Sequence, residues 1–150
     1  MTVEVLNRQA RSPSGLKVNT RLLTSLATRA LELAGADTDY NLSIVLVGDS
    51  QIASLNSRFH HVEGPTDVLS FDYGIRHGEL IISTGRVRTQ ARRFRTTPGN
   101  ELTLYVVHGI LHLNGYDDRT AASRRRMQAR ERRLIKCLAP RPVMQRLVKQ

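Results

Sequence analysis

The segment VHGILHLNGYDD, residues 107–118, places two histidines in an apolar stretch and follows them with a glycine and two acids. Hydrophobic residues surround the histidines on nearly all sides of a helix drawn over residues 100–113, which is typical of a helix buried within a domain. We therefore expect the rest of the fold to pack around this helix. His108 and His112 are four residues apart, so they project from the same side of it.

Two imidazoles on a buried helix need partners for their nitrogen atoms, because an unpaired polar group is costly to bury. A metal ion would satisfy both histidines at once, and the i, i+4 spacing is a common chelating pair. Gly115 can adopt a positive φ and turn the chain back, which would bring Asp117 or Asp118 to the histidines. Two histidines and one aspartate would form a zinc site with an open position, as in catalytic sites. The alternative is a buried pair hydrogen-bonded to backbone or carboxylate.

The flanking sequence predicts one α+β or α/β domain over residues 1–150, with a mixed sheet of about four strands, helices packed on it, and the metal site on the central buried helix. Strands are expected at residues 2–7, 42–47, 68–73 and 79–83. Helices are expected at residues 20–34, 49–56, 84–95, 100–113 and 123–138. We expect Asn100 to cap the central helix and a loop to begin at Phe59.

The net charge of +10 is concentrated in the second half of the chain. Residues 1–83 hold 7 basic and 9 acidic side chains, whereas residues 84–150 hold 16 and 4. Most of the basic residues are arginine, which binds phosphate bidentately, so the distribution favours contact with nucleic acid. The single cysteine, Cys137, and the absence of an apolar leader or a membrane-length apolar run predict a cytoplasmic protein with no membrane association.

Other catalytic classes fit the sequence less well. The zinc peptidase pattern H-E-x-x-H needs a glutamate directly after the first histidine, and Gly109 occupies that position. We find no glycine-rich phosphate loop and no serine or cysteine in a recognisable nucleophile setting.

Three motifs in this order resemble the YbeY family of bacterial endoribonucleases and ribosomal-RNA maturation factors. They are PTDVLSF at residues 65–71, GELII at residues 78–82 and HGILHLNGYDD at residues 108–118, and Met127 and Glu131 also fit the family's pattern. The resemblance implies a single α+β domain with a mixed sheet of four strands and about five or six helices. It also implies one zinc ion per chain, bound by His108, His112 and Asp118. It further implies cleavage of single-stranded RNA in small-subunit (16S) ribosomal-RNA maturation and ribosome quality control, with RNA and the ribosome or its small subunit as partners.

The sequence departs from the family's usual pattern at two positions. The third metal ligand is usually histidine, and Asp118 in its place has a shorter reach and adds a negative charge. An arginine usually follows the aromatic residue before the PTDVLSF loop, whereas here His60 follows Phe59. A histidine there could donate a hydrogen bond to phosphate or act as a general acid.

The leading interpretation is a zinc-dependent endoribonuclease in which metal-activated water attacks the RNA phosphodiester. His60 and His108 are the expected catalytic residues. The residues expected to hold the RNA backbone are Arg58, Arg86, Arg92 and Arg124. Two alternatives remain open: a non-catalytic RNA- or ribosome-binding factor, motivated by positions 60 and 118, and a metallohydrolase that acts on another substrate, including peptides.

Overall fold

The computed structural model describes residues 1–9, 15–60 and 68–149, and for residues 55–60 the backbone alone. Within these residues, the main sheet has four strands in the order β1-β3-β5-β4. Strands β1 (Thr2–Asn7), β3 (Asn41–Val47) and β5 (His77–Ser83) run parallel, and β4 (Val68–Asp72) pairs antiparallel with β5. The sheet is therefore mixed, as the sequence predicts.

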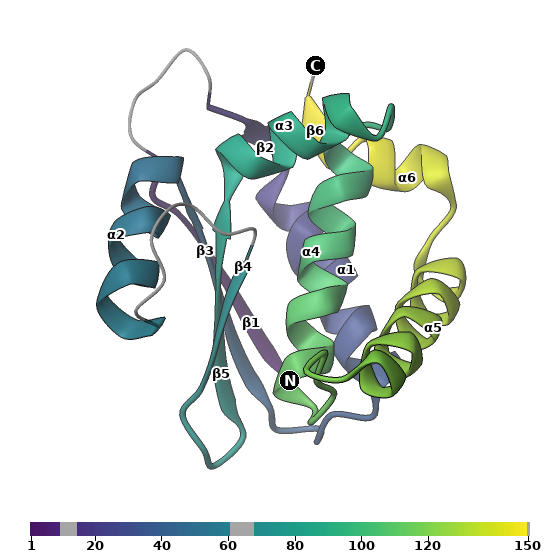
Figure 1. The fold of residues 1–150 in the computed structure, drawn as a ribbon. Coiled ribbons are helices and arrows are strands. Elements are labelled where there is room, and N and C mark those ends of the chain that lie inside the picture. Colours follow the sequence, from purple (N-terminus) through teal and green to yellow (C-terminus); the bar gives the residue numbers. More distant parts are fainter. Residues whose placement is uncertain (10–14, 61–67, 150) are drawn as a thin grey trace.

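Helices cover the two faces of this sheet unequally (Figure 1). Helices α1 (Thr20–Ala34) and α4 (Pro98–Leu113) lie on one side, with α5 (Ala121–Leu138) packed against both of them. Helix α2 (Asp49–His60) lies on the other side. The fold is a single α+β domain with its larger hydrophobic core on the α1–α4 side.

Three shorter features complete the described part of the chain, which contains six helices in all. Helix α3 (Thr84–Arg93) follows β5 directly, and helix α6 (Arg141–Gln145) packs on α4. Strands β2 (Lys17–Val18) and β6 (Val148–Lys149) form a separate two-stranded pair.

Side chains alternate between the two faces of the sheet, as expected for a sheet covered on both sides. The residues that face α4 include Leu42, Ile44, Leu46, Leu80 and Ile82 in the larger core. Those that face α2 form a smaller cluster of Val45, Val47, Leu69 and Ile81 with Ile52 of α2 itself. The near-continuous apolar run of β3 follows from this double coverage.

Helix α4 is the central element, as predicted. It contacts α1, α3, α5, α6, β4 and β5. A Cβ added at Gly109 would lie 2.5 Å from Cδ2 of Leu80, so a larger residue there would require the Leu80 side chain to shift. The glycine after the first histidine therefore lets α4 lie close to β5.

Several helix ends differ from the prediction by a few residues: α3 ends at Arg93 instead of residue 95, α5 begins at Ala121 instead of residue 123, and α4 and α2 also differ. Thr97, rather than Asn100, caps α4: its side chain accepts a hydrogen bond from the backbone N–H of Asn100. Pro98 fits the first turn because it has no N–H to satisfy there. The expected loop at Phe59 was also wrong, since α2 continues to His60 and no proline or glycine interrupts it.

Truncating Leu80 tests this packing. The side chain is fully buried between the sheet and α4, so we expect Leu80→Ala to lower the free energy of unfolding by about 2–5 kcal/mol. Ile75→Ala is the control, because Ile75 is 96% exposed and its truncation should change stability by no more than about 0.5 kcal/mol. Chemical denaturation measures both. Equal effects of the two substitutions would contradict the packing described.

Candidate metal centre

The two histidines of α4 bring their Nε2 atoms together. These atoms are 3.0 Å apart, and the two rings lie edge to face with their centroids 4.6 Å apart. The side chains of His108 and His112 are 32% and 27% exposed. The pair therefore lies at the boundary between the core and solvent, where an ion or a substrate can reach it.

The other nitrogen of each ring already has a partner. Nδ1 of His112 lies 3.0 Å from the carbonyl oxygen of Tyr116, which can only accept, so the proton of this ring belongs on Nδ1. Nδ1 of His108 contacts the carboxylate of Glu131 on α5 and donates to it in the same way. Both Nε2 atoms are then left with lone pairs that point at each other.

This arrangement fits a cation. Two lone pairs 3.0 Å apart repel unless a positive charge lies against both of them. A proton or a metal ion would remove the repulsion, and neutral imidazole with a hydrogen-bonded Nδ1–H is the usual form of a metal-binding histidine. The observed hydrogen bonds thus prepare both rings to bind a metal through Nε2.

The turn after α4 supplies the third group. Gly115 has a φ of +93°, and its N–H donates to the carbonyl of His112 while the N–H of Tyr116 donates to that of Leu111. This pattern is a Schellman motif, which ends a helix and reverses the chain. It confirms the predicted role of Gly115 and places the Tyr116 carbonyl against His112.

Asp118, and not Asp117, faces the histidines. Its Oδ2 atom lies 3.9 Å from Nε2 of His112, and one ligand atom from each of His108, His112 and Asp118 lies within 4.8 Å of the others. The carboxylate of Asp117 points elsewhere: hydrogen bonds from Ser123 and from the backbone N–H of Arg119 hold its pKa below the usual value. The sequence left open which of the two acids turns toward the histidines, and in the structure it is Asp118.

Two imidazoles and a carboxylate are a competent donor set for Zn²⁺. The same set suits other divalent transition metals, including Fe²⁺. The side chain of Asp118 is 51% exposed, so the cluster is open to solvent on that side. An ion held there would keep positions for water or substrate, as catalytic rather than structural sites do.

The basic residues predicted to hold RNA are divided among three helices: Arg58 is on α2, Arg86 and Arg92 are on α3, and Arg124 is on α5. Arg124 is exposed near the start of α5, the helix that packs beside the cluster. Arg86 and Arg92 are on α3, which packs on the N-terminal part of α4, away from the histidines (Figure 1). The side chains of Arg58 and His60 lie outside the described residues.

The role of Glu131 was not predicted, although its position after the histidine motif fits the family's pattern. The sequence does contain one hint of its importance: Glu131 is the one acidic residue among residues 121–138, which include seven basic residues. Its contact with His108 joins residues 23 apart in the chain, and no local pattern predicts that contact.

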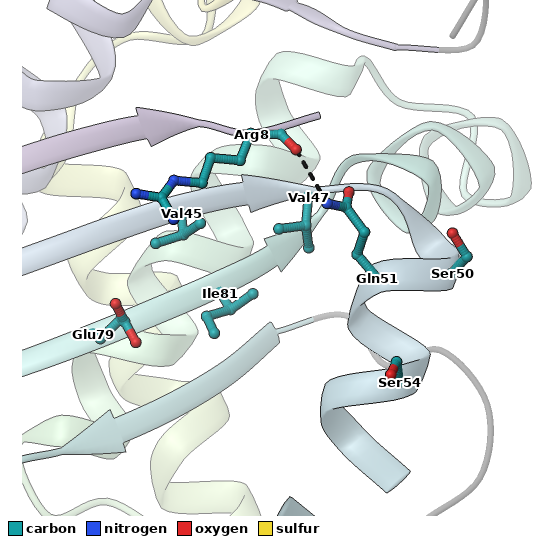
Figure 2. A pocket seen from close by; sticks show the side chains of 8 residues that line it. All are labelled: Arg8, Val45, Val47, Ser50, Gln51, Ser54, Glu79 and Ile81. Carbon is teal, nitrogen blue, oxygen red and sulfur yellow. Dashed lines mark hydrogen bonds between the residues drawn. The ribbon is translucent and has the colours of Figure 1, made fainter. Parts of the chain in front are cut away.

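A hollow lies on the face of the sheet away from α4, beside α2. It has a volume of about 590 Å³. Its floor is made of Val45, Val47 and Ile81, and Glu79 and Arg8 border it (Figure 2). The Arg8 carbonyl accepts a hydrogen bond of 3.3 Å from Nε2 of Gln51. Among the described residues, those that line this hollow do not include His108, His112 or Asp118, so the hollow is separate from the cluster of these three residues.

The fold and the cluster together define an α+β protein with an open two-histidine, one-carboxylate site at the end of a buried helix. The sequence profile of the family described as Endoribonuclease YbeY matches residues 5–139. The chain belongs to this family. No helix in the described part of the chain has the length and apolar character needed to cross a membrane.

Individual relatives agree with the family assignment. The chain is 37% identical over 142 residues to Endoribonuclease YbeY of an Anaeromyxobacter species, covering 91% of this chain and 71% of the relative. It is 34% identical to Endoribonuclease YbeY of Geobacter metallireducens, covering 92% of this chain and 96% of the relative. A Thermotoga maritima protein with a known solution structure matches 90% of this chain and 87% of its own, with 28% identity and a TM-score of 0.63.

Proposed function

We propose that the protein is a zinc-dependent endoribonuclease that cleaves single-stranded RNA in the cytoplasm, in the maturation of small-subunit ribosomal RNA and in ribosome quality control. The main support for metal dependence is the pair of Nε2 atoms of His108 and His112, which lie 3.0 Å apart. The Nδ1–H group of each ring is already hydrogen-bonded to another acceptor. Membership of a family whose relatives are named endoribonucleases supports RNA as the substrate.

In this proposal His108, His112 and Asp118 hold one ion per chain. A bound ion would supply a more acidic water molecule and would polarise the scissile phosphate. The Tyr116 carbonyl keeps the His112 ring oriented by accepting from Nδ1. His60 is proposed, from the sequence resemblance, to donate a proton or a hydrogen bond to the phosphate.

The RNA backbone would lie along the basic surface of α5. Arg124 is exposed on this helix and close in sequence to the turn that carries Asp118, so a strand bound there would pass the cluster. Arg58, Arg86 and Arg92 are proposed to extend the contact. Guanidinium groups bind phosphate without reading the base, so these contacts position the RNA and give no sequence specificity.

Metal analysis beside a cleavage assay tests the proposal. We expect one zinc ion per purified chain and cleavage of unstructured single-stranded RNA. Chelation should abolish cleavage, and added zinc should restore it. Stoichiometric zinc with cleavage of unstructured protein but not of RNA would contradict the choice of substrate.

A non-catalytic RNA- or ribosome-binding factor is the second candidate. The carboxylate of Asp118 favours it, because a negative charge at the cluster repels a phosphate that approaches the ion. RNA binding without bound metal and without cleavage would favour this candidate over the enzyme.

Substitution of Asp118 tests the third ligand. Asp118→Asn keeps the size of the side chain but replaces the charged oxygen by a weaker neutral donor, so we expect the metal dissociation constant to rise by at least roughly tenfold. Asp117→Asn is the matched control, because the Asp117 carboxylate accepts hydrogen bonds from Ser123 and from the backbone N–H of Arg119 and does not face the histidines. Equal affinities in both variants would exclude Asp118 as a ligand.

A further inference from the structure

Glu131 is an isolated carboxylate on a basic helix. Its side chain is 12% exposed, on the side of α5 that faces α4, whereas Arg132 and Arg133 beside it are exposed. A carboxylate this deeply buried needs a hydrogen-bonding or charged partner. The hydrogen-bond partner that the structure gives it is Nδ1 of His108.

The packing of α5 on α4 fixes this contact. Met127 lies one turn before Glu131, and Leu134 lies one turn after it on the same side; their side chains are 1% and 2% exposed in the larger core. The neighbouring Arg130 points away, since its Nη2 atom donates to the carbonyl of Leu33 at 2.8 Å. The carboxylate is therefore held by buried neighbours and has little freedom to leave the histidine.

The contact determines which nitrogen of His108 can bind a cation. An ionised carboxylate can accept hydrogen bonds but cannot donate them. The Glu131 carboxylate therefore keeps the His108 proton on Nδ1 and leaves the lone pair on Nε2. Without this acceptor the proton could move to Nε2, or the ring could rotate. Either change would remove the Nε2 lone pair from its position 3.0 Å from that of His112.

We propose that Glu131 is a positioning residue of the metal centre, which fixes the orientation and tautomer of His108 through its Nδ1–H. The inference rests on the proposed function, because it requires that His108 bind a metal. It makes α5 part of the metal centre: the helix that presents the arginines to RNA also holds a ligand in place. A carboxylate behind a metal-binding histidine typically contributes a factor of 10–100 to metal affinity, and we expect roughly this effect here.

Two substitutions separate positioning from a general structural role. Glu131→Ala removes the acceptor, and we expect the zinc dissociation constant, measured by competition with a chelator, to rise about 10–100-fold. Glu131→Gln keeps an oxygen that can accept from Nδ1–H, so the rise should be smaller, below about tenfold. Cobalt-loaded protein gives a second readout: its visible absorption should change in the alanine variant and be largely restored in the glutamine variant.

The matched control is Glu32→Ala, since Glu32 is half exposed on α1 and pairs with Arg29. Circular dichroism confirms that each variant is folded before metal is added. Wild-type affinity and an unchanged cobalt spectrum in Glu131→Ala would overturn the inference while leaving the proposed function intact. Equal losses in the alanine and glutamine variants would also overturn it. A wild-type protein that binds no divalent ion would overturn the proposed function, and the inference with it.

Discussion

Replacing His112 by alanine is expected to abolish metal binding and RNA cleavage together. The Nε2 atom of His112 lies 3.0 Å from that of His108 and 3.9 Å from Oδ2 of Asp118, so it is the donor that links the other two. Its loss leaves only two protein ligands, His108 and Asp118. Two ligands are too few to hold a metal ion stably at a site that is open to solvent, where three are usual. The metal dissociation constant should rise by more than the roughly 100-fold that loss of an outer-shell partner can cause.

Metal content after dialysis and the rate of cleavage of single-stranded RNA measure this effect. His77→Ala is the matched control, because His77 is exposed, lies outside the cluster and has its ring 5.2 Å from that of Tyr73. The substituted side chain of His112 is partly exposed, so folding should be retained, and circular dichroism checks this. A His112→Ala protein that keeps its zinc, or that cleaves RNA at the wild-type rate without zinc, would contradict the proposed site.

Neutralising the arginines at the start of α5 should weaken RNA binding without removing the metal. Arg124, Arg125 and Arg126 are all exposed. Each phosphate contact on a single strand contributes roughly 0.7 to the slope of log affinity against log salt concentration. Replacing all three by alanine should therefore make this slope shallower by up to about 2, with the largest loss of affinity at low salt.

Fluorescence anisotropy with a labelled single-stranded RNA, over a range of salt concentrations, measures the slope. Arg21→Ala combined with Arg29→Ala is the control, because both side chains are exposed on α1 and have no proposed RNA contact. Zinc content should be the same in both sets of variants. An unchanged salt slope in the α5 variant would show that RNA binds elsewhere.

The sequence predicted the long elements well because each carries its own pattern. The central helix is apolar on nearly all sides, and β3 is a run of β-branched and aliphatic residues, so both were placed to within a few residues. Helix α6 and the β2–β6 pair were not predicted, because such short elements show no helical or alternating pattern of hydrophobic residues. The β2–β6 pair also depends on contacts between Lys17 and Lys149, at opposite ends of the chain.

The candidate metal site was predictable from the sequence to the extent that it is local. His108 and His112 share a helix face, and Gly115 reverses the chain directly after it, so the three-residue cluster follows from about a dozen neighbouring residues. The choice between Asp117 and Asp118 depended on the hydrogen bonds of the turn, which the sequence does not specify. Glu131 depended on how α5 packs against α4, and such long-range packing is not encoded in any one segment.

Anomalous diffraction at the zinc absorption edge, from crystals of the wild-type protein, tests the central claim most directly. We expect one strong peak per chain, bonded to Nε2 of His108, Nε2 of His112 and a carboxylate oxygen of Asp118, with at least one coordination position open to solvent. A peak at other residues, or no peak after soaking in zinc, would contradict a metal centre at the end of α4.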